Sequence, residues 1–476
     1  MSHWLPIVDI AKSVQGGLIS ARSNVEKALQ TIQDNKDFNA IIVSLDESAL
    51  QRADALDAKV RTGDPVGRLA GVPFIAKDNF LVFGAETTAA SNILKGFNAP
   101  YQATAIEKLE AEGAICVAKA NLDAFAHGSS TENSDFMTTK NPHDYMRVPG
   151  GSSGGSAAAV ILDMAPFALG TDTGGSIRLP ASYCGAVGYK PTYGLVSRSG
   201  VIAMASSTDV IGPLTRTVTD AGLVLDVLAG QDDLDGTTIP KDAAGYDNLA
   251  PSLAGRKIGI VKEYMADGIA AGVRTQVDNA IEKIKQAGGV VSEVSLPSLP
   301  SALAVYYILC PAEVSSNLGR YDGQRFGYSY ENATDLTESY KKSRSLGFGK
   351  EAKRRIMIGT YVLSSGYYDA YYKKAQTVRT KLINECKAAF EKFDFLIGPT
   401  APDIAFKIGE NIDDPLKMYL TDILTVAANL VGIPSISIPA GSSDGMPVGL
   451  QLMAAQRADR DLLSLALAVE ELVSWI

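Results

Sequence analysis

The sequence predicts an α/β fold with a large mixed central β-sheet that is covered by helices on both faces. Short apolar runs that are typical of buried strands, such as Arg256–Val261, alternate with amphipathic patterns of helical period. One such pattern places apolar residues at 273, 277, 281 and 284, and Gly288-Gly289 ends it before the next apolar run. Strands and helices that alternate in this way pack as a sheet between two helical layers.

The chain has 476 residues, which exceeds one typical hydrophobic core and favours more than one folding unit. Residues 1–62 predict an N-terminal helical segment that packs on the core. Residues 63–300 and 391–476 carry the alternating pattern and predict the α/β core. Residues 301–390 are rich in tyrosine and charge, and they predict a helical insertion over the candidate site described below.

Local patterns place individual elements along the chain. Apolar residues at i, i+3, i+4 and i+7 predict a helix over Asn24–Ile32, and a similar pattern predicts a second helix over Glu47–Val60. Farther on, Ala105–Glu112 is predicted as a helix that is followed by a strand over Ala114–Lys119. The remaining predicted elements, in chain order, are strands over Phe395–Gly398 and Ile433–Pro439 and a terminal helix rich in leucine and alanine.

The composition excludes several classes of protein. Hydrophobic residues make up 46% of the chain and charged residues 20%, as in an ordinary globular protein. No apolar run reaches the length of a membrane span and the N-terminus lacks a signal-peptide pattern, so we expect a cytoplasmic protein without a membrane partner. The formal net charge of −9 does not predict a surface that neutralises nucleic-acid phosphates.

Metal, disulfide and nucleotide motifs are not evident in the sequence. The four cysteines, which are scattered without C-x-x-C spacing, predict reduced thiols, and three histidines are too few for a histidine-rich metal site. The glycine-rich turns lack the Gly-Lys-Ser/Thr ending of a P-loop and a clean dinucleotide fingerprint. We therefore expect that this chain binds no metal and no cofactor.

Two Gly/Ser-rich clusters stand out against the apolar sequence around them. They are Gly150–Ser156 and Asp172–Arg178, and each adjoins a run that predicts a helix or a strand. Glycine at such positions indicates backbone that has a positive φ or lies close to another group. A hydroxyl at the end of such a turn is well placed to act as a nucleophile, with backbone N–H groups nearby to hold an oxyanion.

The base for such a serine is not a histidine of the usual hydrolase order. Residues Gly151–Gly155 fit the G-x-S-x-G elbow with Ser153 as nucleophile, but that arrangement needs a histidine after the serine, and all three histidines precede it. Lys77 is the better candidate because it follows the apolar run Val72–Ala76. Desolvation of a lysine at the end of a buried strand lowers its pKa towards that of a usable base.

These residues resemble the amidase signature enzymes, and the resemblance covers nearly the whole chain. The Ser–Ser–Lys triad of that family falls here on Ser176 as nucleophile, Ser152 as bridging serine and Lys77 as base. The resemblance also implies the amidase signature fold and a cis peptide bond at Gly151–Ser152. It places the oxyanion hole on the backbone amides of four consecutive residues, Thr173, Gly174, Gly175 and Ser176.

Within that family the chain is similar to the A subunits of tRNA-dependent amidotransferases, which make Gln-tRNA(Gln) or Asn-tRNA(Asn). The similarity rests on the runs Gly128–Ser134, Ala312–Leu318, Gly349–Ile356 and Ser364–Tyr372. The last three lie outside the shared catalytic core, where stand-alone amidases diverge. His127 departs from the pattern, because a small or apolar residue is expected there, and its role stays open.

The resemblance implies that glutamine is the substrate and assigns its contacts. Arg355 would bind the carboxylate, Asp422 the ammonium, and Tyr306 would lie close to the substrate. Arg354 and Tyr307 are adjacent alternatives for the arginine and the tyrosine. The activity implied is that of a glutaminase subunit in a carbon–nitrogen ligase that uses glutamine as amido donor.

The same resemblance implies the partners. The B and C subunits of the amidotransferase would complete a heterotrimer, the complex would use ATP and Mg²⁺, and the B subunit would make most contacts with the charged tRNA. The sequence leaves open whether Glu-tRNA(Gln), Asp-tRNA(Asn) or both are amidated, and which path ammonia takes. Two other hypotheses stand beside this one: a free-standing amidase acting on a small amide, and a catalytically silent scaffold.

Overall fold

The computed structural model of the chain describes residues 3–411 and 414–473. Within them, strands join into one mixed sheet in the order β1-β3-β2-β4-β6-β5-β10-β11-β9-β7-β8. The strands are β1 (Ile41–Ser44), β2 (Pro73–Lys77), β3 (Ile115–Ala120), β4 (Phe167–Asp172), β5 (Val187–Lys190), β6 (Val210–Thr215), β7 (Lys257–Val261), β8 (Val290–Val294), β9 (Phe395–Pro399), β10 (Ser435–Ser443) and β11 (Met446–Ala454).

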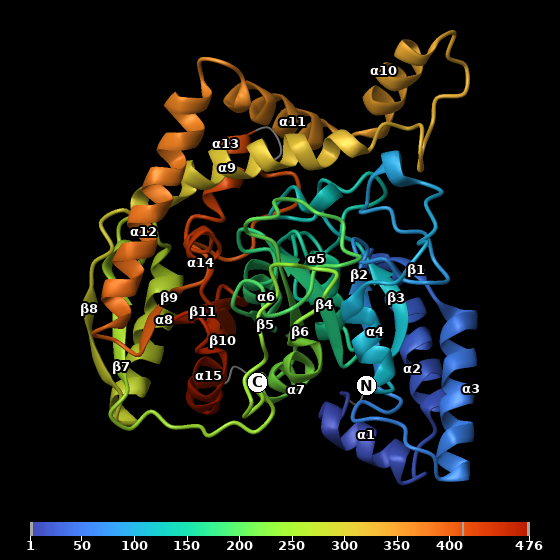
Figure 1. Cartoon of the computed structure of the whole chain (residues 1–476). Coiled ribbons are helices and arrows are strands. Elements are labelled where there is room, and N and C mark those ends of the chain that lie inside the picture. The colour runs from blue at the N-terminus through green and yellow to red at the C-terminus, as the bar shows by residue number, and fades with distance from the viewer. Residues whose placement is uncertain (1–2, 412–413, 474–476) are drawn as a thin grey trace.

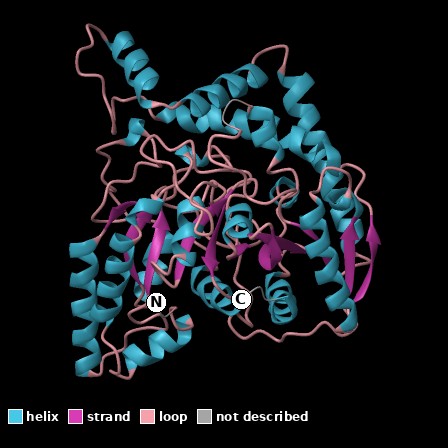
Figure 2. Cartoon of the chain, turned by 180° about the vertical axis from the view of Figure 1, so that it is seen from behind, coloured by secondary structure: helices cyan, strands magenta, loops and turns pink. Residues whose placement is uncertain are grey.

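The sheet is parallel at two places and antiparallel elsewhere. Strand β2 runs parallel to β3 and β4, and β7 runs parallel to β8 and β9. The strands between these groups pair antiparallel, and so does β1 at the sheet edge. Figure 2 shows the strands in a row across the middle of the molecule, with helices on either side. The predicted large mixed sheet is therefore confirmed.

Helices cover both faces of the sheet (Figure 1). The α-helices are α1 (Ile7–Gln15), α2 (Ala21–Asp34), α3 (Asp46–Thr62), α4 (Thr104–Ala111), α5 (Gly154–Ile161), α6 (Arg178–Cys184), α7 (Val218–Leu228), α8 (Ala271–Gln286), α9 (Ala302–Asn317), α10 (Leu336–Gly347), α11 (Lys350–Leu363), α12 (Lys374–Phe390), α13 (Pro415–Leu420), α14 (Val426–Val431) and α15 (Asp459–Val473). Short 3₁₀ segments are η1 (Lys36–Phe38), η2 (Asn92–Leu94), η3 (Ala124–Ala126), η4 (Lys262–Met265), η5 (Leu299–Ser301) and η6 (Leu318–Arg320), and η7 (Tyr368–Lys373) is a π-helix.

Alternate strand residues supply separate hydrophobic cores, because successive side chains of a strand point to opposite faces. On β2, Phe74 and Ala76 pack with the core under α4, α7, α8 and α15, whereas Ile75 packs with α2, α3, α5 and α6. On β9, Leu396 instead joins a third core beneath the helices α9, α12 and α14. Each face of the sheet is therefore buried by its own set of helices.

The N-terminal segment contains more elements than the two helices predicted for residues 1–62. The predicted helices lie within α2 and α3, but α1 precedes them and β1 lies between them as an edge strand of the sheet. Helix α1 buries Ile7, Ile10 and Val14 along one side. The strand β1 has only four residues and gives a weak periodic signal, whereas the apolar residues of α1 do follow a helical period that the prediction passed over.

Most of residues 301–390 lie in the helices α9 to α12, with an irregular stretch over 321–335 between them. Helices α9 and α11 lie side by side along one edge of the molecule, and α12 turns down its flank (Figure 1). The two helices approach closely at Gly359, where a Cβ atom would lie 1.8 Å from the carbonyl oxygen of Pro311. The division of the chain into separate domains stays a prediction.

In the part of the chain that the structure describes, no helix is both long and apolar enough to cross a membrane.

Candidate active site

Lys77 lies at the last position of β2, fully buried, where the sheet brings it beside β4. Its Nζ atom donates to Ser152 Oγ at 2.7 Å, to Ser153 Oγ at 2.9 Å and to Thr171 Oγ1 at 3.0 Å. The structure therefore brings together the lysine and the bridging serine that the sequence pattern singled out. Ser153, considered from the elbow pattern, contacts the same lysine.

Burial lowers the pKa of Lys77 to about 7, because removal from water disfavours the charged ammonium. The carboxylates of Asp123, Asp172 and Asp209 act in the opposite direction but do not cancel this effect. A lysine with this pKa is neutral in a large fraction of molecules near neutral pH. Lys77 can then accept a proton from a neighbouring hydroxyl.

The first glycine cluster forms the loop that presents Ser152 to Lys77. Its Gly151–Ser152 peptide bond is cis, as the family resemblance implied. Thr131 closes the loop, because its hydroxyl donates to the Gly150 carbonyl at 2.8 Å and accepts from the Gly154 N–H at 3.2 Å. Helix α5 begins directly after the loop, at Gly154.

A buried carboxylate, Asp123, packs against Gly151 of this loop and holds the neighbouring loop 128–133. It accepts the N–H groups of Thr131 and Asn133 at 2.9 and 3.1 Å. A Cβ atom on Gly151 would lie 2.1 Å from Asp123 Oδ2, so a larger residue cannot occupy that position without displacing the carboxylate. Burial raises the pKa of Asp123 to about 6.

The second glycine cluster is organised by a buried ion pair between Asp172 and Arg178, which lie 2.9 Å apart. Burial alone would raise the pKa of Asp172, but the adjacent guanidinium overrides that effect and lowers the pKa to about 2. The Asp172 carboxylate also accepts the N–H groups of Gly175 and Ile177 at 2.8 and 3.1 Å. The backbone around Ser176 is therefore fixed by an ionised aspartate.

Segments far along the chain hold the same loop. Arg178 donates to Gln451 Oε1 at 2.6 Å and to Asn429 Oδ1 at 2.7 Å. The hydroxyl of Thr425 donates to the Gly174 carbonyl at 2.6 Å. These contacts tie the loop that carries Ser176, the predicted nucleophile, to α14 and β11.

Ser176 lies 8% exposed at the end of this loop. Its carbonyl accepts the N–H of Ser153 at 3.1 Å, which joins the two glycine clusters directly. Of the four amides predicted for the oxyanion hole, that of Gly175 donates to Asp172 in this structure. A role for the amides of Thr173, Gly174 and Ser176 stays a prediction, as does the step between Ser152 and Ser176.

The predicted substrate residues gather beside the nucleophile loop. The ring of Tyr306 lies against Gly174, where an added Cβ would be 2.7 Å from the ring carbon Cζ. Tyr307 links the two charged residues: its hydroxyl donates to Asp422 Oδ2 at 3.3 Å, and its ring lies 5.4 Å from the Arg355 guanidinium. Tyr306 therefore lies against the loop that carries Ser176, and Tyr307 lies between Arg355 and Asp422.

Arg355 and Arg354 differ in burial. Arg355 is 3% exposed and bonds Glu351 at 2.9 Å, whereas Arg354 is 44% exposed on the same helix and also contacts Glu351. Burial raises the pKa of Asp422 to about 8, against the opposing influence of Arg355. An ammonium beside that carboxyl would favour its ionised form.

His127 lies fully buried in the same region. Neither ring nitrogen has a hydrogen-bond partner among the described residues. Burial, with a smaller contribution from the nearby Arg355 charge, lowers the pKa of His127 well below its usual value. The imidazole is therefore neutral, and it adds no charge to the wall of the site.

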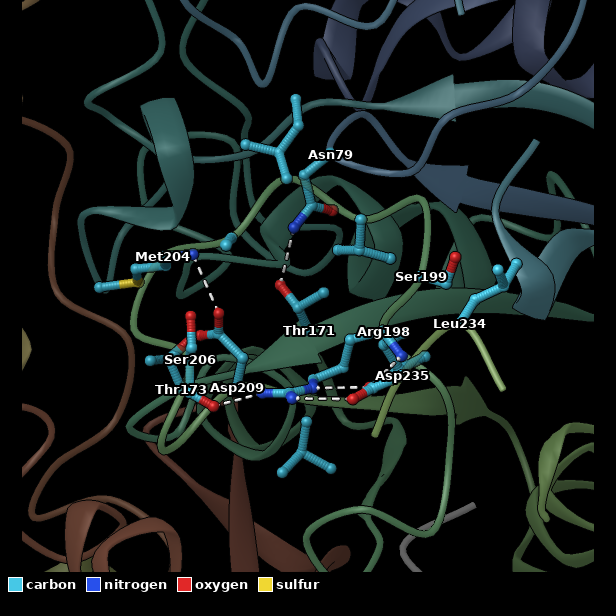
Figure 3. Close-up of a pocket in the computed structure, with 15 residues that line it drawn as sticks. Asn79, Thr171, Thr173, Arg198, Ser199, Met204, Ser206, Asp209, Leu234 and Asp235 are labelled. Carbon is cyan, nitrogen blue, oxygen red and sulfur yellow. Dashed lines mark hydrogen bonds and ion pairs between the residues drawn. The ribbon is translucent and has the colours of Figure 1, made fainter. Parts of the chain in front are cut away.

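A cavity of about 190 Å³ is lined by Thr171 and Thr173 (Figure 3). Asn79 donates to Thr171 Oγ1 at 3.1 Å at its edge, and the Thr173 hydroxyl donates to Asp209 at 2.7 Å. Arg198 and Asp235 form an ion pair of 3.0 Å farther along the wall. The cavity therefore combines polar groups with apolar walls and begins next to the contacts of Lys77.

Comparison with known proteins gives the family. A family model described as Amidase matches residues 23–463. The chain belongs to the amidase family.

Among its amidase relatives are proteins named as the A subunit of glutamyl-tRNA(Gln) amidotransferase. The one from Thermoanaerobacter pseudethanolicus is 50% identical over 471 residues, which cover 98% of this chain and 96% of that protein. The one from Heliobacterium modesticaldum is 52% identical over 435 residues, with 91% and 89% covered. The crystal structure of the A subunit from Thermotoga maritima is similar with a TM-score of 0.79 at 41% identity, over 95% of this chain and 91% of that one.

Solved amidases with other substrates share the fold. A bacterial aryl acylamidase of the amidase signature family matches with a TM-score of 0.87 at 27% identity, over 99% of this chain and 97% of that one. The amidase fold alone therefore does not select the substrate.

Sequence reasoning missed two groups of this amidase site. Asp123 and Thr131, which hold the Ser152 loop, were not singled out, although Thr131 lies within the quoted run Gly128–Ser134. Thr425 and Gln451 were missed because no local pattern connects them with the nucleophile loop. The one local signal for Asp123 is an acidic residue a few positions after the predicted strand Ala114–Lys119.

Proposed function

We propose that this chain is the glutamine-hydrolysing A subunit of a tRNA-dependent amidotransferase. One observation carries the chemistry: a buried lysine, with its pKa lowered to about 7, lies 2.7 Å from the hydroxyl of Ser152 at the end of a central strand. Curated relatives at about half identity over nearly the whole chain are named as that subunit. The two observations together favour glutamine as the amide that is cleaved.

The mechanism begins with Ser176. Its Oγ attacks the side-chain carboxamide carbon of glutamine, while Lys77 takes the hydroxyl proton through Ser152. The backbone amides of Thr173, Gly174 and Ser176 stabilise the oxyanion, since that of Gly175 donates to Asp172. The C–N bond then breaks, the proton returns to the departing nitrogen, and ammonia leaves. Water attacks the acyl-enzyme and releases glutamate, which restores the Ser176 hydroxyl.

Three residues would recognise the donor. The buried Arg355 guanidinium is suited to a carboxylate, since Glu351 and the Tyr307 ring hold it in place. Asp422 would accept the α-ammonium, and Tyr306 would contact the substrate across Gly174. A site built for both charges rejects amides that lack them, because its own charges would stay unpaired.

Ammonia would leave through the cavity of Figure 3. Thr171 and Thr173 line that cavity, and Thr171 also contacts Lys77. A protected route of this kind would deliver ammonia to the B subunit, where an activated aminoacyl-tRNA is amidated. The C subunit would complete the complex, which would use ATP and Mg²⁺, with charged tRNA bound mainly by the B subunit. A cytoplasmic location follows from this function and stays a prediction.

The deciding experiment measures ammonia release from glutamine by the full chain, with and without its partner subunits and charged tRNA. Ser176→Ala should lower that release by at least about 10³-fold while leaving the fold unchanged, because only the nucleophile is removed. Added ammonium salt should still support tRNA amidation by the complex that carries the variant. Glutaminase activity that survives in Ser176→Ala would refute the assigned nucleophile.

A free-standing amidase is the second candidate, supported by the shared fold of solved amidases such as the aryl acylamidase. The ammonia-release assay distinguishes a free-standing amidase from an amidotransferase subunit. A free-standing amidase would cleave small neutral amides at least as well as glutamine, and charged tRNA and partner subunits would not change its rate.

A further inference from the structure

Helix α11 carries apolar side chains on the face that points away from the core. Its inner face, which packs on α9, buries four residues: Ala352, Arg355, Gly359 and Val362. On the outer face Met357 is 72% exposed and Tyr361 is 48% exposed. A surface helix normally presents polar side chains to water, so these two residues do not serve the packing of this chain.

The apolar face continues onto the π-helix η7, which leads into α12. Tyr367 and Tyr371 of η7 are exposed as well. The ring centroid of Tyr361 lies 4.3 Å from that of Tyr367 and 6.1 Å from that of Tyr371. Met357 and Tyr361 are neighbours one helical turn apart, so the four side chains form one continuous surface, called the tyrosine patch below. Exposed apolar patches of this kind mark interaction sites, and π-helices occur frequently at functional positions.

The segment that carries the tyrosine patch is basic, whereas the chain as a whole is acidic. Residues 341–381 contain eleven lysines and arginines and two acidic residues, Glu351 and Asp369, which gives a net charge of +9 in a chain of net charge −9. Both acidic residues already pair with basic neighbours on their own helices. Lys350, two turns before Met357 on α11, and Lys374, directly after η7, are exposed. A partner that covers the patch must therefore supply negative charge.

The composition of the patch favours a protein over a nucleic acid as that partner. Tyrosine, methionine and arginine are enriched at the centres of protein interfaces, where they fill apolar pockets. Nucleic-acid bases stack on aromatic rings whose faces are free. The rings of Tyr361 and Tyr367 instead pack against each other, and Met357 and the exposed Ile358 offer aliphatic surface that a base or phosphate does not use.

We propose that the tyrosine patch is the surface on which a partner subunit of the amidotransferase docks, through an apolar hollow rimmed by acidic side chains. This inference rests on the proposed function and names the part of this chain on which the complex assembles. The proposed hydrolysis of glutamine uses none of the four side chains. Arg355 lies on the inner face of the same helix, so the docked subunit contacts the helix that carries the predicted carboxylate contact.

The test measures the Kd between the full chain and a purified complex of its B and C subunits by isothermal titration calorimetry. Met357→Ser/Tyr361→Ser should raise the Kd by about 10- to 100-fold, because side chains at the centre of an interface carry most of the binding energy. Its melting temperature should stay within about 2 °C of wild type, since both side chains are exposed. The matched control is Leu5→Ser/Leu18→Ser, which changes two exposed leucines beside α1, at the opposite end of the molecule (Figure 1). The control should change the Kd by less than about twofold.

The basic rim is tested by the rate of association. Lys350→Glu/Lys374→Glu should lower the association rate constant by about tenfold at low salt and weaken its dependence on salt, because charges at the rim of an interface act mainly on association. Lys36→Glu/Lys59→Glu, which makes the same change of charge at two exposed lysines of the N-terminal segment, should have a smaller effect. Equal effects of the two charge variants would show that net charge alone is felt, and would overturn the assignment of the rim.

An unchanged Kd in Met357→Ser/Tyr361→Ser would overturn the inference. It would also be overturned if these substitutions abolished binding of charged tRNA to the isolated chain, or self-association of the chain, and left the Kd for the B and C subunits unchanged. The patch would then serve a nucleic acid or a second copy. A wild-type chain that does not bind the purified subunits would instead refute the proposed function, and this result is seen without any variant.

Discussion

Two lysines of the central sheet are alike in burial and differ in their partners. Lys77 on β2 and Lys190 on β5 are both fully buried, and burial lowers the pKa of each to about 7. Lys77 Nζ contacts two serine hydroxyls, whereas Lys190 Nζ donates to the carbonyl of the next residue, Pro191, at 3.1 Å. A lowered pKa therefore marks burial, and only the hydroxyl partners mark the lysine that can do chemistry.

The charges near the two lysines differ as well. Three carboxylates, led by Asp123, act to raise the pKa of Lys77. After burial, the strongest influence on Lys190 is Arg178, which lowers its pKa further, since two cations in one buried region repel each other. The carboxylates of Asp172 and Asp459 act to raise the pKa of Lys190 but do not cancel the effect of burial, so its protonated form costs stability.

The largest expected contrast is in activity. Lys77→Met should lower kcat/KM for glutamine by about 10²- to 10⁴-fold, the usual contribution of a general base. Lys190→Met, a matched change of the other buried lysine, should leave kcat/KM within about threefold. Steady-state ammonia release from both variants is the measurement. Similar losses in the two variants would show that the lysines act through the fold alone.

The pH dependence of kcat/KM should also distinguish Lys77 from Lys190. Lys77 must be neutral to accept a proton, and Asp422, with a pKa of about 8, must be ionised to pair with the substrate ammonium. The value of kcat/KM for glutamine should therefore level off above about pH 8, fall about tenfold per pH unit between pH 8 and 7, and fall more steeply below pH 7. The profile of Lys190→Met should keep this acidic limb. Asp422→Asn should lower the overall rate and remove the part of the limb between pH 7 and 8, but the fall of about tenfold per pH unit below pH 7 should remain because Lys77 still titrates. A limb that disappears in Lys190→Met would contradict the assignment of Lys77 as base.

The smallest contrast concerns stability, where the two lysines should behave alike. A lysine whose folded pKa is about 7 binds its proton more weakly than in the unfolded chain, where the pKa is about 10.4. The unfolded state therefore holds more protons between those values, and the free energy of unfolding rises with pH from about 7 to 10. Lys190→Met should flatten that rise and raise the melting temperature at pH 6 by about 1–3 °C.

Lys77→Met should give a similar shift, measured in the same thermal scans. A lower melting temperature at pH 6 in Lys190→Met would show that its bond to Pro191 outweighs the cost of its burial.

Local patterns were enough to predict the frame of the molecule. The alternating apolar runs predicted the sheet, and the end of an apolar run predicted the position of Lys77. The two glycine clusters predicted the loops that carry Ser152 and Ser176. Each of these signals lies within a few residues of the feature it describes.

The parts that the sequence did not predict depend on contacts between distant segments. The edge strand β1 consists of four residues, and its pairing with β3 defines it. The bond from Thr131 to the Gly150 carbonyl is of the same kind. So is the bond of Gly409 that orients Glu132, which lies 277 positions earlier in the chain. Such contacts follow from the folded topology and leave no periodic trace in the sequence.

The bonds from Arg178 to Asn429 and Gln451 also have a consequence for synthesis on the ribosome. The nucleophile loop leaves the ribosome early, but the residues that fix it emerge near the end of translation, since chains are made from the N-terminus. A nascent chain therefore holds Lys77, Ser152 and Ser176, the three residues of the proposed triad, without the support that fixes their geometry. We therefore expect unfinished chains to hydrolyse no glutamine, and activity to arise only after α14 and β11 have docked.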